Sequence, residues 1–104
     1  MTDPITPPED CRSMPELRVA IDRLDAQLVA MLARRQAYIE RAAVLKADRD
    51  TVRDTPRVEE VVRNVVAEAE RAGLSPAIAE AVWRTLIEAS IAHEYKAFDT
   101  KDRP

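Results

Sequence analysis

Glycine is almost absent from this chain, which has one Gly among 104 residues, and only 4% of its residues are aromatic. Alternation of apolar and polar residues, the pattern of a half-buried strand, is also scarce, so the sequence predicts an all-α protein. No apolar run approaches the length of a membrane span, and the first residues lack the basic start and apolar run of a secretory signal. We therefore expect a cytoplasmic location and no membrane partner.

Cysteine and histidine are equally scarce, with one residue of each. Cys11 cannot form an internal disulfide, and His93 lacks the second histidine of a zinc-binding helix motif. We therefore expect Cys11 to have no special role, His93 to be a surface residue, and the protein to need no metal or other cofactor. The net charge is −3, and basic residues are mixed with acidic ones, which argues against a nucleic-acid partner.

The length and the 46% hydrophobic content predict one globular domain over residues 1–104. Prolines in residues 1–12 predict an extended N-terminal arm. Ser13-Met14-Pro15-Glu16 then fits a capping box, which marks the start of a helix. Apolar residues recur with helical spacing to about Leu45, so this helix should run about 35 residues, or roughly 50 Å. A monomer of this size cannot easily cover such a rod, which favours association.

Two further helices should follow a charged segment, residues 47–55, which is typical of a surface loop or a frayed helix end. Thr55-Pro56 predicts the N-cap and first residue of the second helix, and valines at three- and four-residue spacing extend it to Gly73. Ser75-Pro76 repeats the start signal for a third helix. The predicted set is one very long helix, one short and one medium. The inner face of the third helix should carry Ile78, Val82, Trp83, Leu86, Ile87, Ser90, Ile91, Glu94 and Phe98.

A cation, Arg35, lies in the middle of the apolar stripe of the first helix. An unpaired buried guanidinium is costly, so a protein carboxylate or a bound anion should meet it. Lys46 lies eleven residues later, close to three whole turns, which places both cations on one face about 16 Å apart. Arg18 lies about 25 Å before Arg35 along the axis and on a different side of the helix. Arg18 could therefore join the same small site only from a partner subunit.

Other residues add polar groups, and each candidate has an ordinary alternative. Arg57 opens the second helix, where free backbone N–H groups favour an anion. Ser90 and Glu94 lie one turn apart on the apolar side of the third helix. Taken singly, most of these residues would be read as surface cations, caps or packing residues. That alternative applies to Arg18, Arg35, Lys46, Asp54, Arg57, Ser90 and Glu94.

Over nearly its whole length the chain resembles the all-helical class of chorismate mutases, which includes the related isochorismate pyruvate lyases. The order and spacing of five segments carry the resemblance, namely Leu17–Asp25, Arg34-Arg35, Lys46, Val52–Arg57 and Leu86–Glu94. The segment Pro8–Cys11, the run Asp22–Asp25 and the compact loop after Lys46 look more like the lyase branch. Ser90 looks more like the mutase branch.

The resemblance implies an intertwined homodimer in which the long first helices pair and each of two sites borrows an arginine across the interface. It implies that Arg35 and the partner subunit's Arg18 bind the two carboxylates of the substrate. Lys46 would bind a carboxylate and the ether oxygen of the breaking bond. Four further positions, of which Glu94 departs from the family's usual glutamine, would complete the site. Arg57 would close over it, Asp54 and Ser90 would orient the ring hydroxyl, and Glu94 would face the ether oxygen.

Glu94 would repel a dianionic substrate unless its carboxyl group is protonated, in which case it can donate the hydrogen bond that glutamine donates. We therefore expect activity to fall as the pH rises through the titration of Glu94.

The function implied by the resemblance is that of an isomerase that converts chorismate to prephenate without a cofactor. Such a pericyclic reaction requires no protein nucleophile, because orientation and charge stabilisation are enough. The first alternative is an isochorismate pyruvate lyase that makes salicylate and pyruvate. The second alternative is a noncatalytic helical dimer that serves as a binding or regulatory module. The presence of all four cations of the site argues against it.

Overall fold

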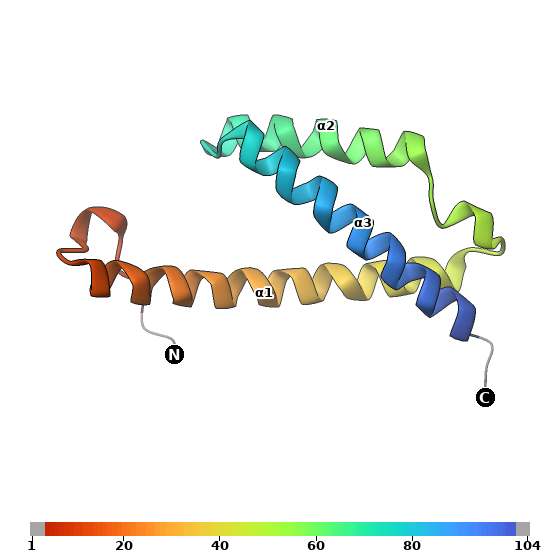
Figure 1. Cartoon of the computed structure of the whole chain (residues 1–104), viewed down its shortest axis with the longest axis horizontal. Coiled ribbons are helices and arrows are strands. Elements are labelled where there is room, and N and C mark those ends of the chain that lie inside the picture. Colours follow the sequence, from red (N-terminus) through yellow and green to blue (C-terminus); the bar gives the residue numbers. More distant parts are fainter. Residues whose placement is uncertain (1–3, 102–104) are drawn as a thin grey trace. The chain divides into compact units, whose positions relative to one another are not determined.

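The computed structural model describes residues 4–101, which form three α-helices and no strand (Figure 1). Helix α1 spans Met14–Leu45, α2 spans Thr55–Ala72 and α3 spans Pro76–Thr100. Their lengths are 32, 18 and 25 residues, so the prediction of an all-α chain with one very long helix is confirmed. Among the described residues, no helix combines the length and the apolar character needed to cross a membrane.

The first helix begins where the capping signal predicts. The backbone N–H of Glu16 donates to Ser13 Oγ at 3.3 Å, and the Glu16 carboxylate accepts from the backbone N–H of Arg12 at 2.8 Å. The carboxylate thus reaches one residue beyond the N-cap itself. The contact to Ser13 satisfies one of the backbone donors that a helix start leaves without an intrahelical partner, and the contact to Arg12 fixes the residue before the N-cap.

The second helix begins one residue earlier than the sequence predicts. Asp54, not Thr55, is its N-cap, and Asp54 Oδ1 accepts from the backbone N–H of Arg57 at 3.1 Å. An aspartate is a slightly better N-cap than a threonine, which explains the shift. At the other end of α2, Gly73 adopts φ 79°, the left-handed conformation that ends many helices. Ser75 caps α3 as predicted.

The part of the predicted N-terminal arm that the structure describes, residues 4–12, is not extended throughout. Pro8–Asp10 form a short 3-10 turn, and the backbone N–H of Asp10 donates to the carbonyl of Pro7 at 3.0 Å. The segment turns back alongside α1, as the hydrogen bond from the Arg23 guanidinium to the carbonyl of Pro4, at 3.5 Å, shows. Figure 1 shows this hook at the start of α1. Residues 1–3 lie outside the described range.

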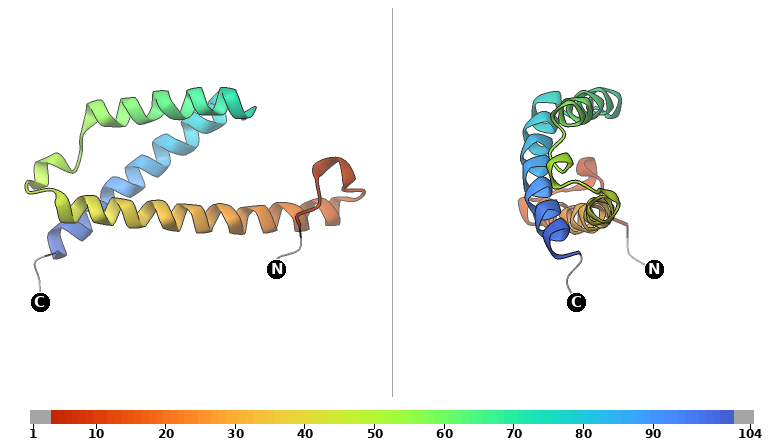
Figure 2. Two further views of the ribbon diagram at one scale, coloured as in Figure 1. Left: turned by 180° about the vertical axis from the view of Figure 1, so that it is seen from behind. Right: turned by 90° about the vertical axis from the view of Figure 1, so that its right-hand side faces the viewer.

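Residue contacts divide the chain into two compact units with their boundary between Ala37 and Tyr38, inside α1. The single domain over residues 1–104 therefore stays a prediction. The second unit holds the end of α1, the connecting loop, α2 and α3. Within it, α2 and α3 adjoin at their shared turn and diverge from there, and the last turns of α3 lie beside the end of α1 (Figure 2).

The core of the second unit forms where the connecting loop meets α2 and α3. Its buried residues are Val52, Val62, Ile87 and Ile91, and Val58, Val61, Val66, Trp83, Tyr95 and Phe98 pack against them. Trp83 is thus a packing residue, as expected. Val52 differs from the prediction, because the segment read as a surface loop contributes a side chain that is only 4% exposed. An apolar side chain buried from a loop ties that loop to the core.

Helix α1 keeps most of its predicted apolar stripe uncovered. Ile21, Leu24, Leu28 and Leu32 are 46%, 50%, 54% and 42% exposed, and Ala43 is the buried residue of this helix. Exposed apolar residues at helical spacing are typical of surfaces that pack against another element.

Candidate active site

Two of the predicted site residues, Lys46 and Glu94, form an ion pair at the end of α1. Lys46 Nζ lies 2.7 Å from Glu94 Oε2, and it also donates to the backbone carbonyl of Val52 at 3.4 Å. The Lys46 side chain is 28% exposed and the Glu94 side chain only 6%. Charged groups are seldom buried without a partner, so each group stabilises the other in this position.

The ion pair depends on the local sequence of both helices. Ile87 and Ile91 are buried in the core, and Glu94 follows Ile91 by three residues, so the same face of α3 carries the carboxylate inward. Lys46 comes directly after the last residue of α1, and its backbone N–H continues the helical pattern by donating to Ala42 at 3.0 Å. Ser90 is half-buried one turn before Glu94 on α3.

His93, which the sequence predicts to be a surface residue, is partly exposed in the structure and has a carboxylate partner. Its Nε2 lies 2.6 Å from Glu40 Oε2, and its side chain is partly buried. Adjacent residues of α3 therefore bind two different points near the end of α1, through His93 to Glu40 and through Glu94 to Lys46. No sequence pattern indicates this pair, since Glu40 is one of many charged residues on a long helix.

The other predicted site residues of the second unit lie at the start of α2. Asp54 is exposed and uses Oδ1 to cap the helix. Arg57 is exposed and forms an ion pair with Glu60, one turn further along α2. This contact matches the ordinary surface alternative for Arg57. In the first unit, Arg18 is exposed on α1, whereas Arg35 is half-buried.

The connecting loop is anchored to α3 by two arginines. Arg49 forms two hydrogen bonds with Asp99, at 2.9 and 3.3 Å, and its guanidinium lies 4.4 Å from the ring centroid of Tyr95. Arg53 forms two hydrogen bonds with Glu88, which hold the pKa of this carboxyl group below its usual value. The loop that follows Lys46 is therefore fixed along α3.

Lys101 is a cation near the site that the sequence reasoning missed. Its Nζ donates to the carbonyls of Ala43 at 3.1 Å and Lys46 at 2.6 Å. The signal was present, because Glu94, Phe98 and Lys101 follow the i, i+4, i+7 spacing of one helix face. The inner face of α3 thus extends to its last turn.

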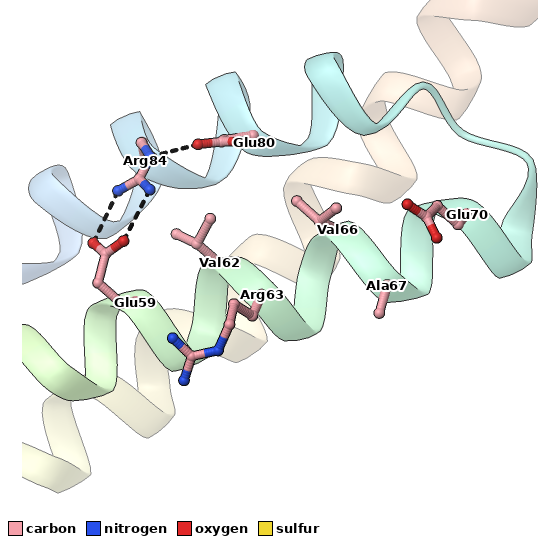
Figure 3. Close-up of a pocket in the computed structure, with 8 residues that line it drawn as sticks. All are labelled: Glu59, Val62, Arg63, Val66, Ala67, Glu70, Glu80 and Arg84. Atoms are coloured by element: carbon pink, nitrogen blue, oxygen red, sulfur yellow. Dashed lines mark hydrogen bonds and ion pairs between the residues drawn. The ribbon is translucent and has the colours of Figure 1, made fainter.

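A groove of about 380 Å³ lies between α2 and α3, and neither Lys46 nor Glu94 lines it (Figure 3). One of its two guanidinium groups, that of Arg84, binds the carboxylates of Glu59 and Glu80. The pKa of Glu59 is lowered by the hydrogen bonds from Arg84. The groove is a poor site for an anion, because three carboxylates, those of Glu59, Glu70 and Glu80, outnumber its two guanidinium groups. The residues that line it are Glu59, Val62, Arg63, Val66, Ala67, Glu70, Glu80 and Arg84.

The chemistry available at Lys46 and Glu94 is that of a half-buried ammonium group with an acid beside it. Such a pair can bind an anionic oxygen through the ammonium group, and the acid can donate a hydrogen bond when protonated. Within residues 4–101, no group of three or more His, Cys, Asp or Glu residues lies close enough together to hold a metal ion.

Comparison with known proteins gives two matches. Residues 17–95 match the sequence profile of the family described as chorismate mutase type II. The chain is also 33% identical over 89 residues to a protein of Pseudomonas aeruginosa named isochorismate pyruvate lyase, and the match covers 86% of this chain and 88% of that protein. The first match includes both Lys46 and Glu94. The chain belongs to the chorismate mutase type II family.

Proposed function

We propose that this protein is a chorismate mutase, which rearranges chorismate to prephenate without a protein nucleophile. The observation that carries the proposal is the Lys46 ammonium group, held half-buried 2.7 Å from Glu94 in a chain of this family. In the rearrangement, an ether bond breaks while a carbon–carbon bond forms, and negative charge develops on the ether oxygen. A fixed cation beside that oxygen stabilises the transition state more than the ground state.

The substrate is a dianion, so the site requires more positive charge than Lys46 supplies. Arg35 is the second cation of the proposed site, and its eleven-residue spacing from Lys46 predicts that it lies on the same helix face. A guanidinium binds a carboxylate through two parallel hydrogen bonds, which fixes the orientation of the substrate as well as its position. Asp54, Arg57 and Ser90 are the remaining members of the proposed site.

The second carboxylate would be bound by Arg18 of the partner subunit in a homodimer. The exposed apolar stripe of α1 supports this arrangement, because two copies that pair along it would cover one another. In an antiparallel pair with its twofold axis between residues 26 and 27, Arg18 of one copy is level with Arg35 of the other. The same register places Ile21 level with Leu32 of the other copy, and both residues belong to the exposed apolar stripe.

Isochorismate pyruvate lyase is the second candidate function, since the Pseudomonas relative carries that name. Cleavage of isochorismate to salicylate and pyruvate can use the same cations. The two reactions differ in whether a carbon–carbon bond forms or a hydrogen migrates as the ether bond breaks. The pose of the enolpyruvyl side chain decides between these outcomes.

The test is a paired assay of the purified protein with chorismate and with isochorismate, in which prephenate, salicylate and pyruvate are quantified. We expect prephenate from chorismate as the main product, at a rate that falls steeply in Arg35→Ala. Salicylate and pyruvate in equal amounts, with little prephenate, would assign the lyase reaction instead. Turnover of neither substrate would leave only the noncatalytic alternative.

The position of Glu94 leads to a pH prediction. In its ionised form Glu94 neutralises Lys46 and repels the substrate, whereas in its protonated form it can donate to the ether oxygen. We therefore expect kcat/KM of the natural protein to be lower at pH 9 than at pH 4.5, and Glu94→Gln, whose amide can donate at either pH, to flatten this profile. The measurement is kcat/KM between pH 4.5 and 9 for both proteins. Identical profiles would remove this role from Glu94.

A further inference from the structure

We propose that Lys101 is a positioning residue that fixes Lys46 by capping the end of α1. The inference rests on the proposed function for its catalytic consequence, but its structural part can be tested separately. Lys101 follows the last residue of α3 and is far from Lys46 in the sequence, yet both belong to the same compact unit.

The contacts of Lys101 are those of a helix C-cap supplied from another helix. The last carbonyls of a helix have no intrahelical donor and carry the negative end of the helix dipole. Lys101 Nζ donates to two carbonyls in this region, that of Ala43 at 3.1 Å and that of Lys46 at 2.6 Å. The ammonium group also lies 4.0 Å from the ring centroid of Phe98, which limits its freedom.

Lys46 is consequently held at both ends. Its carbonyl is bound by Lys101, and its ammonium group is bound by Glu94 and by the carbonyl of Val52. These contacts come from α3, from the residue that follows it and from the loop that α3 anchors. Because the cation is already held at several points, it needs to move less when negative charge develops beside it, and the free-energy cost of that reorganisation is smaller.

The same end of α3 holds the next turn of the loop. Arg49, three residues after Lys46, binds Asp99 and lies over Tyr95. Within the loop, the backbone N–H groups of Thr51 and Val52 donate to Asp48 and Arg49, at 3.0 and 3.1 Å. Loss of the Lys101 contacts should therefore loosen the segment from Lys46 to Val52 and leave the α2–α3 turn unaffected.

The experiment compares the natural protein with Lys101→Met, Lys101→Arg and a matched control. The control is Lys96→Met, which removes the same charge from an exposed position in the last part of α3. Two quantities are measured for each protein, namely amide hydrogen exchange of residues 46–52 and the separate values of kcat and KM. Residues 62–72 of α2 serve as the internal reference for exchange.

In Lys101→Met we expect amide exchange at Lys46, Thr51 and Val52 to quicken about tenfold relative to the reference. We expect kcat to fall about tenfold with a smaller change in KM, because misplacing the cation weakens binding of the transition state most. Lys101→Arg should recover most of both quantities, and Lys96→Met should match the natural protein.

Two results would overturn the proposal. The first is exchange in Lys101→Met that equals that of Lys96→Met, because the loop would then be held without the cap. The second is loosened exchange with an unchanged kcat in a protein that turns over its substrate. If the natural protein turns over neither chorismate nor isochorismate, the proposed function fails, and the exchange result still decides whether Lys101 positions Lys46.

Discussion

Lys46→Met is expected to lower kcat/KM for the preferred substrate by about 10²- to 10³-fold, the usual loss when one preorganised charge at an oxyanion is removed. Methionine keeps most of the length of the side chain and removes its charge. In the structure the ammonium group is 28% exposed and fixed by Glu94 and the Val52 carbonyl. The substitution therefore removes a cation that neither solvent nor a neighbouring residue can easily replace.

The single variant also leaves the carboxylate of Glu94 without its cation in a position where its side chain is only 6% exposed. Leaving one member of a buried ion pair without its partner is strongly destabilising. The double variant Lys46→Met/Glu94→Gln separates the two effects, because a neutral amide replaces the orphaned charge. We expect thermal unfolding to return toward that of the natural protein while activity stays low. Recovery of activity along with stability would show that Lys46 has only a structural role.

Arg18→Ala is expected to lower kcat/KM by at least about 100-fold, although Arg18 is an exposed residue about 25 Å from Arg35 along the axis of its own helix. The reason is that Arg18 would bind the second substrate carboxylate in the site of the partner subunit. In the monomer, loss of an exposed cation so far from the site would be close to neutral.

The matched control is Arg41→Ala, which removes an exposed arginine from the same helix. Sedimentation of both variants at the assay concentration shows whether the dimer is retained. A dimeric Arg18→Ala with the activity of Arg41→Ala would contradict the proposed role. Loss of activity in a protein that has become monomeric would instead assign Arg18 to assembly.

Most of the fold could be predicted from local signals. Ser13, Ser75 and Gly73 mark helix ends through hydrogen bonds and backbone conformations that involve only neighbouring residues, and these predictions are confirmed. The start of α2 was misplaced by one residue, because Asp54 and Thr55 are adjacent and both are acceptable caps. The anchored loop was missed because a single valine, Val52, sets its burial, and one apolar residue among charges produces no periodic signal.

The site was predictable where helical spacing carries information and not where two separate segments meet. The spacing along α3 predicts that Glu94 faces inward, and its burial confirms this. The pairing of His93 with Glu40 depends on how α3 crosses the end of α1, and nothing in either helix specifies that crossing. Helical spacing places Lys101 on the same face as Glu94, but it does not specify what Lys101 binds, since its two acceptors are backbone carbonyls, which every residue possesses.

In the proposed homodimer, each site combines Lys46 and Arg35 of one copy with Arg18 of the other. The most direct test refolds Arg18→Ala and Lys46→Met together in equal amounts and measures turnover of the mixture. Half of the dimers formed at random are mixed, and one of the two sites in each mixed dimer holds all natural residues. We therefore expect about one quarter of the natural activity from two nearly inactive proteins. A mixture no more active than its components, in which mixed dimers are shown to form, would contradict the shared site.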